Sequence, residues 1–136
     1  MAYLKPRPSK AAFKVKRGLA GLGLAATGII KRSEFIIEYF GPLLTNKEFE
    51  ARGDGKYFFD VGKKYTIDGS VRYNIARYLN HSCDPNCYSE QEGTRIFIYA
   101  RRKIEAGEEL TYDYGKEYVE EYISPYGCRC ASCAAS

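Results

Sequence analysis

Short runs of β-forming residues, separated by glycine-containing turns, are the feature that most constrains the fold of this chain. Apolar runs of this length favour strands, because helices need longer periodic segments. We expect strands at residues 13–15, 29–30, 35–40, 57–61, 65–68, 95–100 and 110–114. Only residues 45–52 and 71–79 carry the pattern of short helices. The sequence therefore predicts a mainly β fold, a β-rich α+β arrangement with several small sheets and short helices.

Length and composition predict one soluble globular domain. The 136 residues are 45% hydrophobic and 28% charged, which is ordinary for a domain with a buried core. No apolar run approaches the roughly 20 residues of a membrane-spanning helix. No apolar segment follows the N-terminal cations as it would in a secretory signal. The net charge of +4 is too small to predict nucleic-acid binding. Neither a membrane nor nucleic acid is an expected partner.

The cysteines indicate a reducing compartment. Their number, five, is odd and argues against a fully paired disulfide framework. Cys128, Cys130 and Cys133 form a Cys-x-Cys-x2-Cys cluster, which is typical of metal ligands. A set of free thiols is the alternative. We expect an intracellular protein, cytoplasmic in a bacterium and nuclear or chromatin-associated in a eukaryote or a virus.

A dense polar run at residues 77–87 follows an apolar segment. It contains the only histidine, His81, between Asn80 and a nearby cysteine, Cys83. The Asp-Pro-Asn sequence at its centre predicts a constrained loop. A lone histidine is usually structural, but beside a cysteine it also fits a zinc ligand or the base of a Cys-His nucleophile pair. The residue types alone leave these roles open.

Gly21, Leu22 and Gly23 lie in a glycine-rich segment, residues 17–26, that we expect to form a turn. Dinucleotide-binding loops also use closely spaced glycines, and Glu38 stands where their ribose-binding acid would be. That fold needs a strand before the glycines, a full helix after them and further β-α repeats, which this sequence lacks. A plain structural turn is a second interpretation, since glycine permits positive φ. We favour a third, in which the glycines let main-chain atoms approach a ligand.

Four motifs, in order along the chain, resemble the signature of the SET-domain protein lysine methyltransferases. They are Gly-x-Gly at 21–23, Glu-Tyr-x-Gly at 38–41, Asp68 followed by Asn-x-x-Arg-Tyr-x-Asn-His-Ser-Cys-x-Pro-Asn at 74–86, and Gly-Glu-Glu-Leu-Thr-Tyr-Asp-Tyr at 107–114. The last two are long and specific, and the resemblance covers about residues 13–133. It implies a SET-domain fold with knot-like C-terminal threading. It also implies a flexible basic N-terminus (1–12), a SET domain (13–115) and a post-SET-like tail (116–136).

The resemblance also implies roles for the matched residues. Tyr114 aligns with the catalytic tyrosine, Tyr39 with a wall of the lysine channel, and Tyr112 with a switch position that affects the degree of methylation. The residues implied to bind S-adenosylmethionine are Gly21, Leu22, Gly23, Tyr57, Arg77, Tyr78, Asn80 and His81. One structural zinc ion is implied, with the ligands Cys83, Cys128, Cys130 and Cys133. Cys87 is then a spare thiol that we expect to be buried and unreactive.

The activity implied by the resemblance is transfer of a methyl group from S-adenosylmethionine to a lysine of a basic peptide or protein, such as a histone or histone-like protein. A hydroxyl at Tyr112 implies mainly monomethylation, extending to dimethylation. The sequence departs from the family at Ala25, where an aromatic residue is frequent, and at Tyr73, where glycine is common. A non-catalytic SET-like binding module and a small zinc-dependent nucleic-acid binder are the alternatives.

Overall fold

A computed structural model describes residues 6–18, 21–52 and 57–113 of the chain. These residues divide into two compact units. The first unit contains the described residues within 6–10, 35–77 and 89–98, and the second those within 11–34, 78–88 and 99–113. Most of the described elements are short strands in three sheets, accompanied by one short α-helix and one 3₁₀ helix. The predicted β-rich fold of several small sheets with short helices is confirmed.

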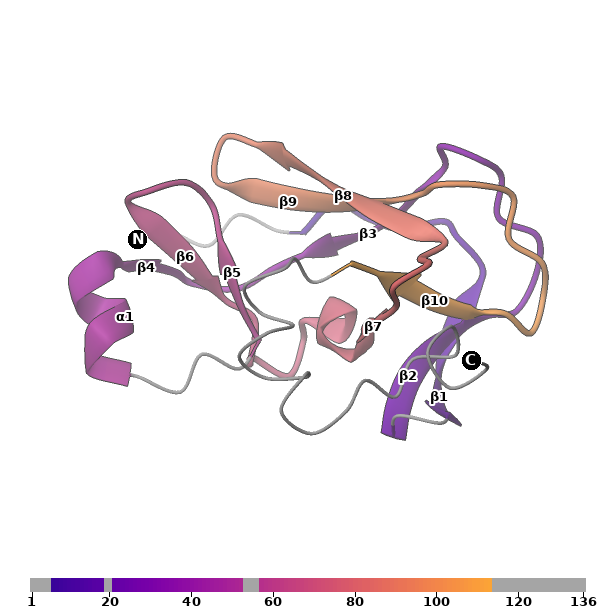
Figure 1. Cartoon of the computed structure of the whole chain (residues 1–136), viewed down its shortest axis with the longest axis horizontal. Helices are drawn as coiled ribbons and strands as arrows, with labels where there is room; N and C mark the ends of the chain where they lie inside the picture. Colours follow the sequence, from indigo (N-terminus) through magenta and orange to yellow (C-terminus); the bar gives the residue numbers. More distant parts are fainter. Residues whose placement is uncertain (1–5, 19–20, 53–56, 114–136) are drawn as a thin grey trace. The chain divides into compact units, whose positions relative to one another are not determined.

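The second unit contains a four-stranded sheet in the order β1-β2-β10-β7 (Figure 1). Its strands are β1 (Phe13–Gly18), β2 (Gly21–Ala26), β10 (Glu109–Tyr112) and the two-residue β7 (Asn80–His81). β10 runs antiparallel to β2, with Leu110 opposite Leu24, and parallel to β7, with Thr111 opposite Asn80. β10 therefore brings the glycine-rich segment and the Asn-His motif into one sheet.

Apolar side chains from distant parts of the sequence form the core of the second unit. Ile30 and Ile104 are joined by an antiparallel bridge with hydrogen bonds of 2.9 Å in both directions. The largest fully buried aliphatic side chains of this core are Leu24, Ile30, Leu79, Ile104 and Leu110. Their burial from water stabilises the sheet by about 1.5–3 kcal/mol per side chain.

The first unit contains a three-stranded sheet in the order β4-β6-β5 and the α-helix. Its elements are β4 (Leu43–Thr45), α1 (Asn46–Arg52), β5 (Phe58–Asp60) and β6 (Tyr65–Asp68). Thr45 Oγ1 accepts a hydrogen bond from the Glu48 amide at 3.3 Å, and the Glu48 carboxylate accepts one from the Thr45 amide at 3.2 Å. This reciprocal capping box explains why the helix begins at the Thr-Asn pair, as predicted.

A further three-stranded sheet has the order β3-β9-β8. It consists of β3 (Phe35–Tyr39), β8 (Cys87–Glu92) and β9 (Arg95–Ala100). Glu38 of β3 is 3% exposed, and Arg95 of β9 donates two hydrogen bonds to its carboxylate, at 2.9 and 2.7 Å. Glu38 is therefore an ion-pair partner inside the first unit.

The N-terminal segment also contacts this part of the first unit. The Arg7 amide donates a 2.8 Å hydrogen bond to Glu38 Oε1, and the Ser9 hydroxyl donates one to the Ile36 carbonyl. The Arg7 guanidinium lies 4.5 Å from the centre of the Phe35 ring. Residues 6–10 thus make specific contacts with β3, within the stretch that the sequence predicts to be a flexible basic terminus.

Several sequence predictions of secondary structure are wrong. The glycine-rich segment contributes a strand, β2, and not only a turn. The short helix predicted at 71–79 is present as a 3₁₀ helix, η1 (Ile75–Tyr78), whereas at 29–30 the predicted strand is reduced to a bridge at Ile30. The sequence did not predict the strands β4, β7 and β8. The predicted C-terminal threading involves residues from 114 onward, which lie outside the described residues.

Candidate functional site

Three strands of the second unit bring Gly23, Asn80 and Glu109 together. Asn80 Nδ2 donates a 2.7 Å hydrogen bond to Glu109 Oε2 and a 3.1 Å hydrogen bond to the Leu22 carbonyl. A Cβ atom at Gly23 would lie 2.5 Å from Glu109 Oε2 and 2.9 Å from Asn80 Nδ2. Any side chain at position 23 would therefore displace one of these two groups. The predicted cofactor residues Gly23 and Asn80 are neighbours in space.

The glycine pair serves two different structural purposes. Gly21 has a φ of 96°, which favours glycine, and it begins β2 directly opposite Gly18 in β1. Gly23 is buried and leaves room for the Asn80 and Glu109 side chains. Leu22, between them, is 45% exposed, and its carbonyl accepts a hydrogen bond from Asn80. The groups that approach the Gly23 backbone closely are therefore two protein side chains, those of Asn80 and Glu109.

The His81 side chain is held by protein groups. The side chain is 5% exposed, its Nε2 lies 3.4 Å from Cys83 Sγ, and its Nδ1 lies 3.7 Å from Asp113 Oδ1. Burial lowers the pKa of His81 below its usual value, and the nearby Asp113 carboxylate opposes that effect. Both ring nitrogens thus lie next to side chains of the same unit.

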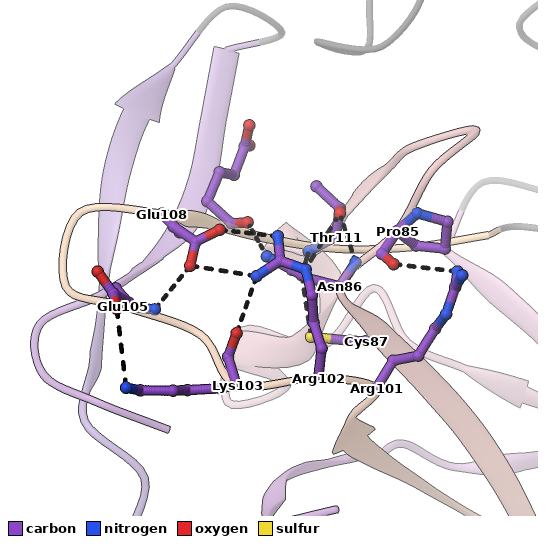
Figure 2. A network of polar contacts seen from close by, with 10 residues as sticks. Pro85, Asn86, Cys87, Arg101, Arg102, Lys103, Glu105, Glu108 and Thr111 are labelled. Carbon is purple, nitrogen blue, oxygen red and sulfur yellow. Dashed lines mark hydrogen bonds and ion pairs between the residues drawn. The ribbon is translucent and has the colours of Figure 1, made fainter. Parts of the chain in front are cut away.

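Asn86 anchors the loop after the Asn-His motif, and sequence reasoning assigned it no role (Figure 2). Its Oδ1 accepts a 2.9 Å hydrogen bond from the Thr111 amide, and its Nδ2 donates a 2.8 Å hydrogen bond to the Glu109 carbonyl. The Arg101 amide donates to the Asn86 carbonyl at 2.8 Å. The asparagine at the end of the long polar motif was the available signal. It ties that loop to β10.

Cys87 is buried, as predicted. It is 1% exposed, and burial raises its pKa to about 12. A thiol with such a pKa stays protonated near neutral pH, and the thiolate is the form that reacts and binds metals. Cys83, by contrast, is exposed.

In the first unit, Tyr39 occupies a closely fitted position. Its side chain is 4% exposed, and its hydroxyl donates a 2.5 Å hydrogen bond to the Tyr57 carbonyl. A Cβ atom at Gly69 would overlap Oη, Cε1 and Cζ of Tyr39. The Phe59 ring lies 5.3 Å away, centre to centre. Gly69, which the sequence did not single out, therefore leaves the space that the Tyr39 ring fills.

Tyr57 supports Tyr39 from an unusual backbone conformation. Its φ is 64°, a left-handed value that is rare for a bulky residue and costs about 1–3 kcal/mol. The Tyr57 carbonyl also accepts a 2.8 Å hydrogen bond from the Gly69 amide. Arg77 lies with its guanidinium 5.8 Å from the centre of the Tyr57 ring and donates a 2.7 Å hydrogen bond to the Ser70 carbonyl. The predicted residues Tyr39, Tyr57 and Arg77 thus form one cluster.

The other sequence-predicted residues occupy the following places. Tyr112 is 7% exposed and lies in β10 opposite His81, and Tyr78 is the half-buried last residue of η1 in the second unit. Ala25 is buried in β2, whereas Tyr73 is 54% exposed with its ring 5.6 Å from that of Phe40. The departures from the family pattern at positions 25 and 73 are therefore accommodated differently, one in the core and one at the surface.

Tyr114 and the three tail cysteines, Cys128, Cys130 and Cys133, lie outside the described residues. Within the ranges 6–18, 21–52 and 57–113, no three His, Cys, Asp or Glu side chains gather as metal ligands would. In the same ranges, no helix has the length and apolar character needed to cross a membrane.

Comparison with known proteins gives a consistent result. A family model of the SET domain matches residues 21–115. The "Histone-lysine N-methyltransferase trithorax" of Drosophila virilis is 42% identical over 123 residues, which are 82% of this chain and 3% of that protein. "Histone-lysine N-methyltransferase ATXR7" of Arabidopsis thaliana is 38% identical over 140 residues, covering 94% of this chain and 10% of that protein.

A third relative, "Histone-lysine N-methyltransferase ASHR3" of Arabidopsis thaliana, is 41% identical over 130 residues, 87% of this chain. The chain spans 26% of that protein and a smaller share of the other two. The similarity is thus confined to one part of each of these three proteins.

Proposed function

Because the chain belongs to the SET-domain family, we propose that it is a protein-lysine N-methyltransferase. It transfers a methyl group from S-adenosylmethionine to a lysine of a histone or histone-like protein, and in a eukaryote it would act on chromatin. The main support for the proposal is that Gly23, Asn80 and Glu109 lie next to one another. Each of these residues belongs to a different family motif, so three motifs are adjacent in space. The three relatives described above carry names with the same activity.

The chemistry of this point fits the amino-acid end of S-adenosylmethionine. Both hydrogen bonds of Asn80 described here use Nδ2, so its Oδ1 is the acceptor that can bind an ammonium group. The Glu109 carboxylate adds negative charge beside it. Gly21, Leu22, Gly23, Tyr57, Arg77, Tyr78, Asn80 and His81 are the proposed cofactor residues. When bound, S-adenosylmethionine supplies a methyl group on a positively charged sulfur.

The protein must prepare the lysine for this methyl group. In water a lysine side chain has a pKa near 10.4 and lacks a free lone pair at neutral pH. Transfer therefore requires loss of one proton, exclusion of water and alignment of the amine with the methyl carbon. The amine nitrogen then forms the new N–C bond while the S–C bond breaks and its electron pair returns to sulfur. Tyr39, Tyr112 and Tyr114 are the residues that we propose line and orient this lysine.

A methylation assay on intact protein tests the proposal directly. The chain is incubated with S-adenosylmethionine and core histones, and mass spectrometry locates any added methyl groups. We expect methylated lysines, and we expect Tyr114→Phe to lower turnover strongly with little change in cofactor affinity. Cofactor binding without methylation of any histone or other protein extract would instead favour a binding module. Absence of cofactor binding would overturn the proposal.

Replacing Tyr112 with phenylalanine is expected to raise the degree of methylation. We propose that the hydroxyl at this position holds a water molecule in the space that additional methyl groups need, so that the unsubstituted chain yields mainly monomethyllysine, with some dimethyllysine. Tyr112 is 7% exposed, and removal of one hydroxyl leaves the ring in place. Mass spectrometry of the products after equal turnover measures the shift. An unchanged product distribution would contradict the assignment.

We also propose one structural zinc ion, bound by Cys83, Cys128, Cys130 and Cys133. Protein purified under reducing conditions should contain about one zinc per chain, measured by elemental analysis, because four thiolates complete a tetrahedral site. Cys83→Ala is expected to lose this zinc. Cys87→Ala is the matched control and should keep it, since burial raises the pKa of Cys87 to about 12. Equal zinc loss in both variants, or zinc-free wild-type protein, would contradict this site.

A further inference from the structure

The Glu109 carboxylate contacts the Asn80 amide, and the sequence motifs did not predict this contact. Glu109 begins β10, between β2 and β7 in the sheet. Its side chain is half-buried, and its Oε2 accepts the 2.7 Å hydrogen bond from Asn80 Nδ2. The neighbouring residue, Glu108, pairs instead with Arg102 at 2.8 Å (Figure 2). Two adjacent carboxylates therefore have separate partners.

A carboxylate at this position determines which way the Asn80 amide faces. An ionised carboxylate only accepts hydrogen bonds, and the Leu22 carbonyl is likewise an acceptor. Both neighbours therefore require the NH₂ group of Asn80 on their side. Rotation of the amide by about 180° would place Oδ1 against two acceptors, which is repulsive. The Asn80 oxygen is thus directed away from Glu109 and Leu22.

Gly23 makes this arrangement possible. A Cβ atom there would come within 2.9 Å of Asn80 Nδ2 and still closer to Glu109 Oε2. The contact between Asn80 and Glu109 is therefore built into the packing of three strands. Hydrogen bonds to charged groups are roughly twice as strong as those between neutral groups, enough to hold one amide orientation.

We propose that Glu109 is a positioning residue for cofactor binding, which fixes the Asn80 amide so that its oxygen accepts a hydrogen bond from the α-ammonium group of S-adenosylmethionine. The negative charge of Glu109 further favours that cationic end. The inference rests on the proposed function and extends it to a residue without an assigned role.

Calorimetry with three ligands tests the inference. S-adenosylmethionine and S-adenosylhomocysteine both carry the amino-acid group, whereas 5′-methylthioadenosine lacks it. For Glu109→Ala we expect the Kd of the first two to rise by about tenfold, because one charge-assisted contact is lost. The Kd of methylthioadenosine should stay within about twofold of the wild-type value. Glu109→Gln retains an acceptor without the charge and should give an intermediate loss.

Glu108→Gln is the matched control. It removes one carboxylate from the adjacent position, where the hydrogen bond from Arg102 lowers the Glu108 pKa, and it should leave all three Kd values unchanged. Thermal unfolding verifies that each variant is folded. If Glu109→Ala does not fold, Glu109→Gln takes its place in the comparison.

The outcomes separate the inference from the proposed function. If the wild-type chain binds S-adenosylmethionine and the Glu109 variants bind it equally well, the inference alone is wrong. An equal loss for all three ligands would also overturn it, since that result indicates general damage to the pocket. If the wild-type chain does not bind S-adenosylmethionine, the proposed function fails and the inference fails with it.

Discussion

Arg95→Met is expected to destabilise the protein by about 3–5 kcal/mol, because it leaves a buried carboxylate without its cation. The Glu38 side chain is only 2% exposed, and Arg95 NH2 lies 2.7 Å from its Oε1. The hydrogen bond to Glu38 raises the Arg95 pKa above its usual value, so the guanidinium is charged at any working pH. Without Arg95, only the 2.8 Å hydrogen bond from the Arg7 amide remains among the contacts described here. Urea unfolding of the variant and the wild type measures the difference.

A double-mutant cycle separates the charge from the packing. Glu38→Leu combined with Arg95→Met replaces both charges by apolar groups and should be much less destabilised than Arg95→Met alone. Arg95→Lys keeps the charge but loses the two-pronged geometry, and it should fall between the wild type and Arg95→Met. If the free energy of unfolding of Arg95→Met lies within about 0.5 kcal/mol of the wild-type value, Arg95 is not needed to stabilise the buried Glu38 carboxylate.

The sequence identified the strand with the strongest β-forming run but missed β4, β7 and β8. Residues 95–100 carry a continuous β-forming run and form β9 as predicted. β7 has only two residues, too few for any periodic pattern, and it exists because β10 pairs with it. Local patterns cannot predict a strand whose stabilising hydrogen bonds come from a distant segment.

At the candidate site, the glycine-rich segment shows the same limit of prediction from local sequence patterns. Its glycines suggested a turn, yet of Gly21 and Gly23, which the structure describes within β2, Gly21 alone has the positive φ that a turn uses. Gly23 lies within β2, where side chains from β7 and β10 occupy the space a Cβ would need. The motifs singled out Gly23 and Asn80, and these two residues lie next to each other in space. Glu109 was missed because a carboxylate in a long motif carries no sign of which amide it binds.

Gly69→Ala is expected to lower the turnover of lysine methylation by about 100-fold, since displacement of a catalytic group by about 1 Å can have this effect. A methyl group at position 69 would occupy the space of the Tyr39 ring. The ring has little room to move, because Tyr39 is 4% exposed and its hydroxyl binds the Tyr57 carbonyl at 2.5 Å. The methyl group must therefore shift Tyr39, Tyr57 or both.

Tyr39→Phe is the matched comparison, because it removes the hydroxyl and leaves the ring against Gly69. If the position of the ring forms the channel wall, Tyr39→Phe should lose much less activity than Gly69→Ala. The opposite order would mean that the hydroxyl itself is the important group. Steady-state kinetics with a saturating peptide gives kcat, and calorimetry gives the cofactor Kd of each variant. A folded Gly69→Ala protein with wild-type kcat would refute a catalytic role for Tyr39. A loss of kcat at unchanged Kd would place Tyr39 in the transfer step, because only an interaction made in the transition state lowers turnover without weakening binding.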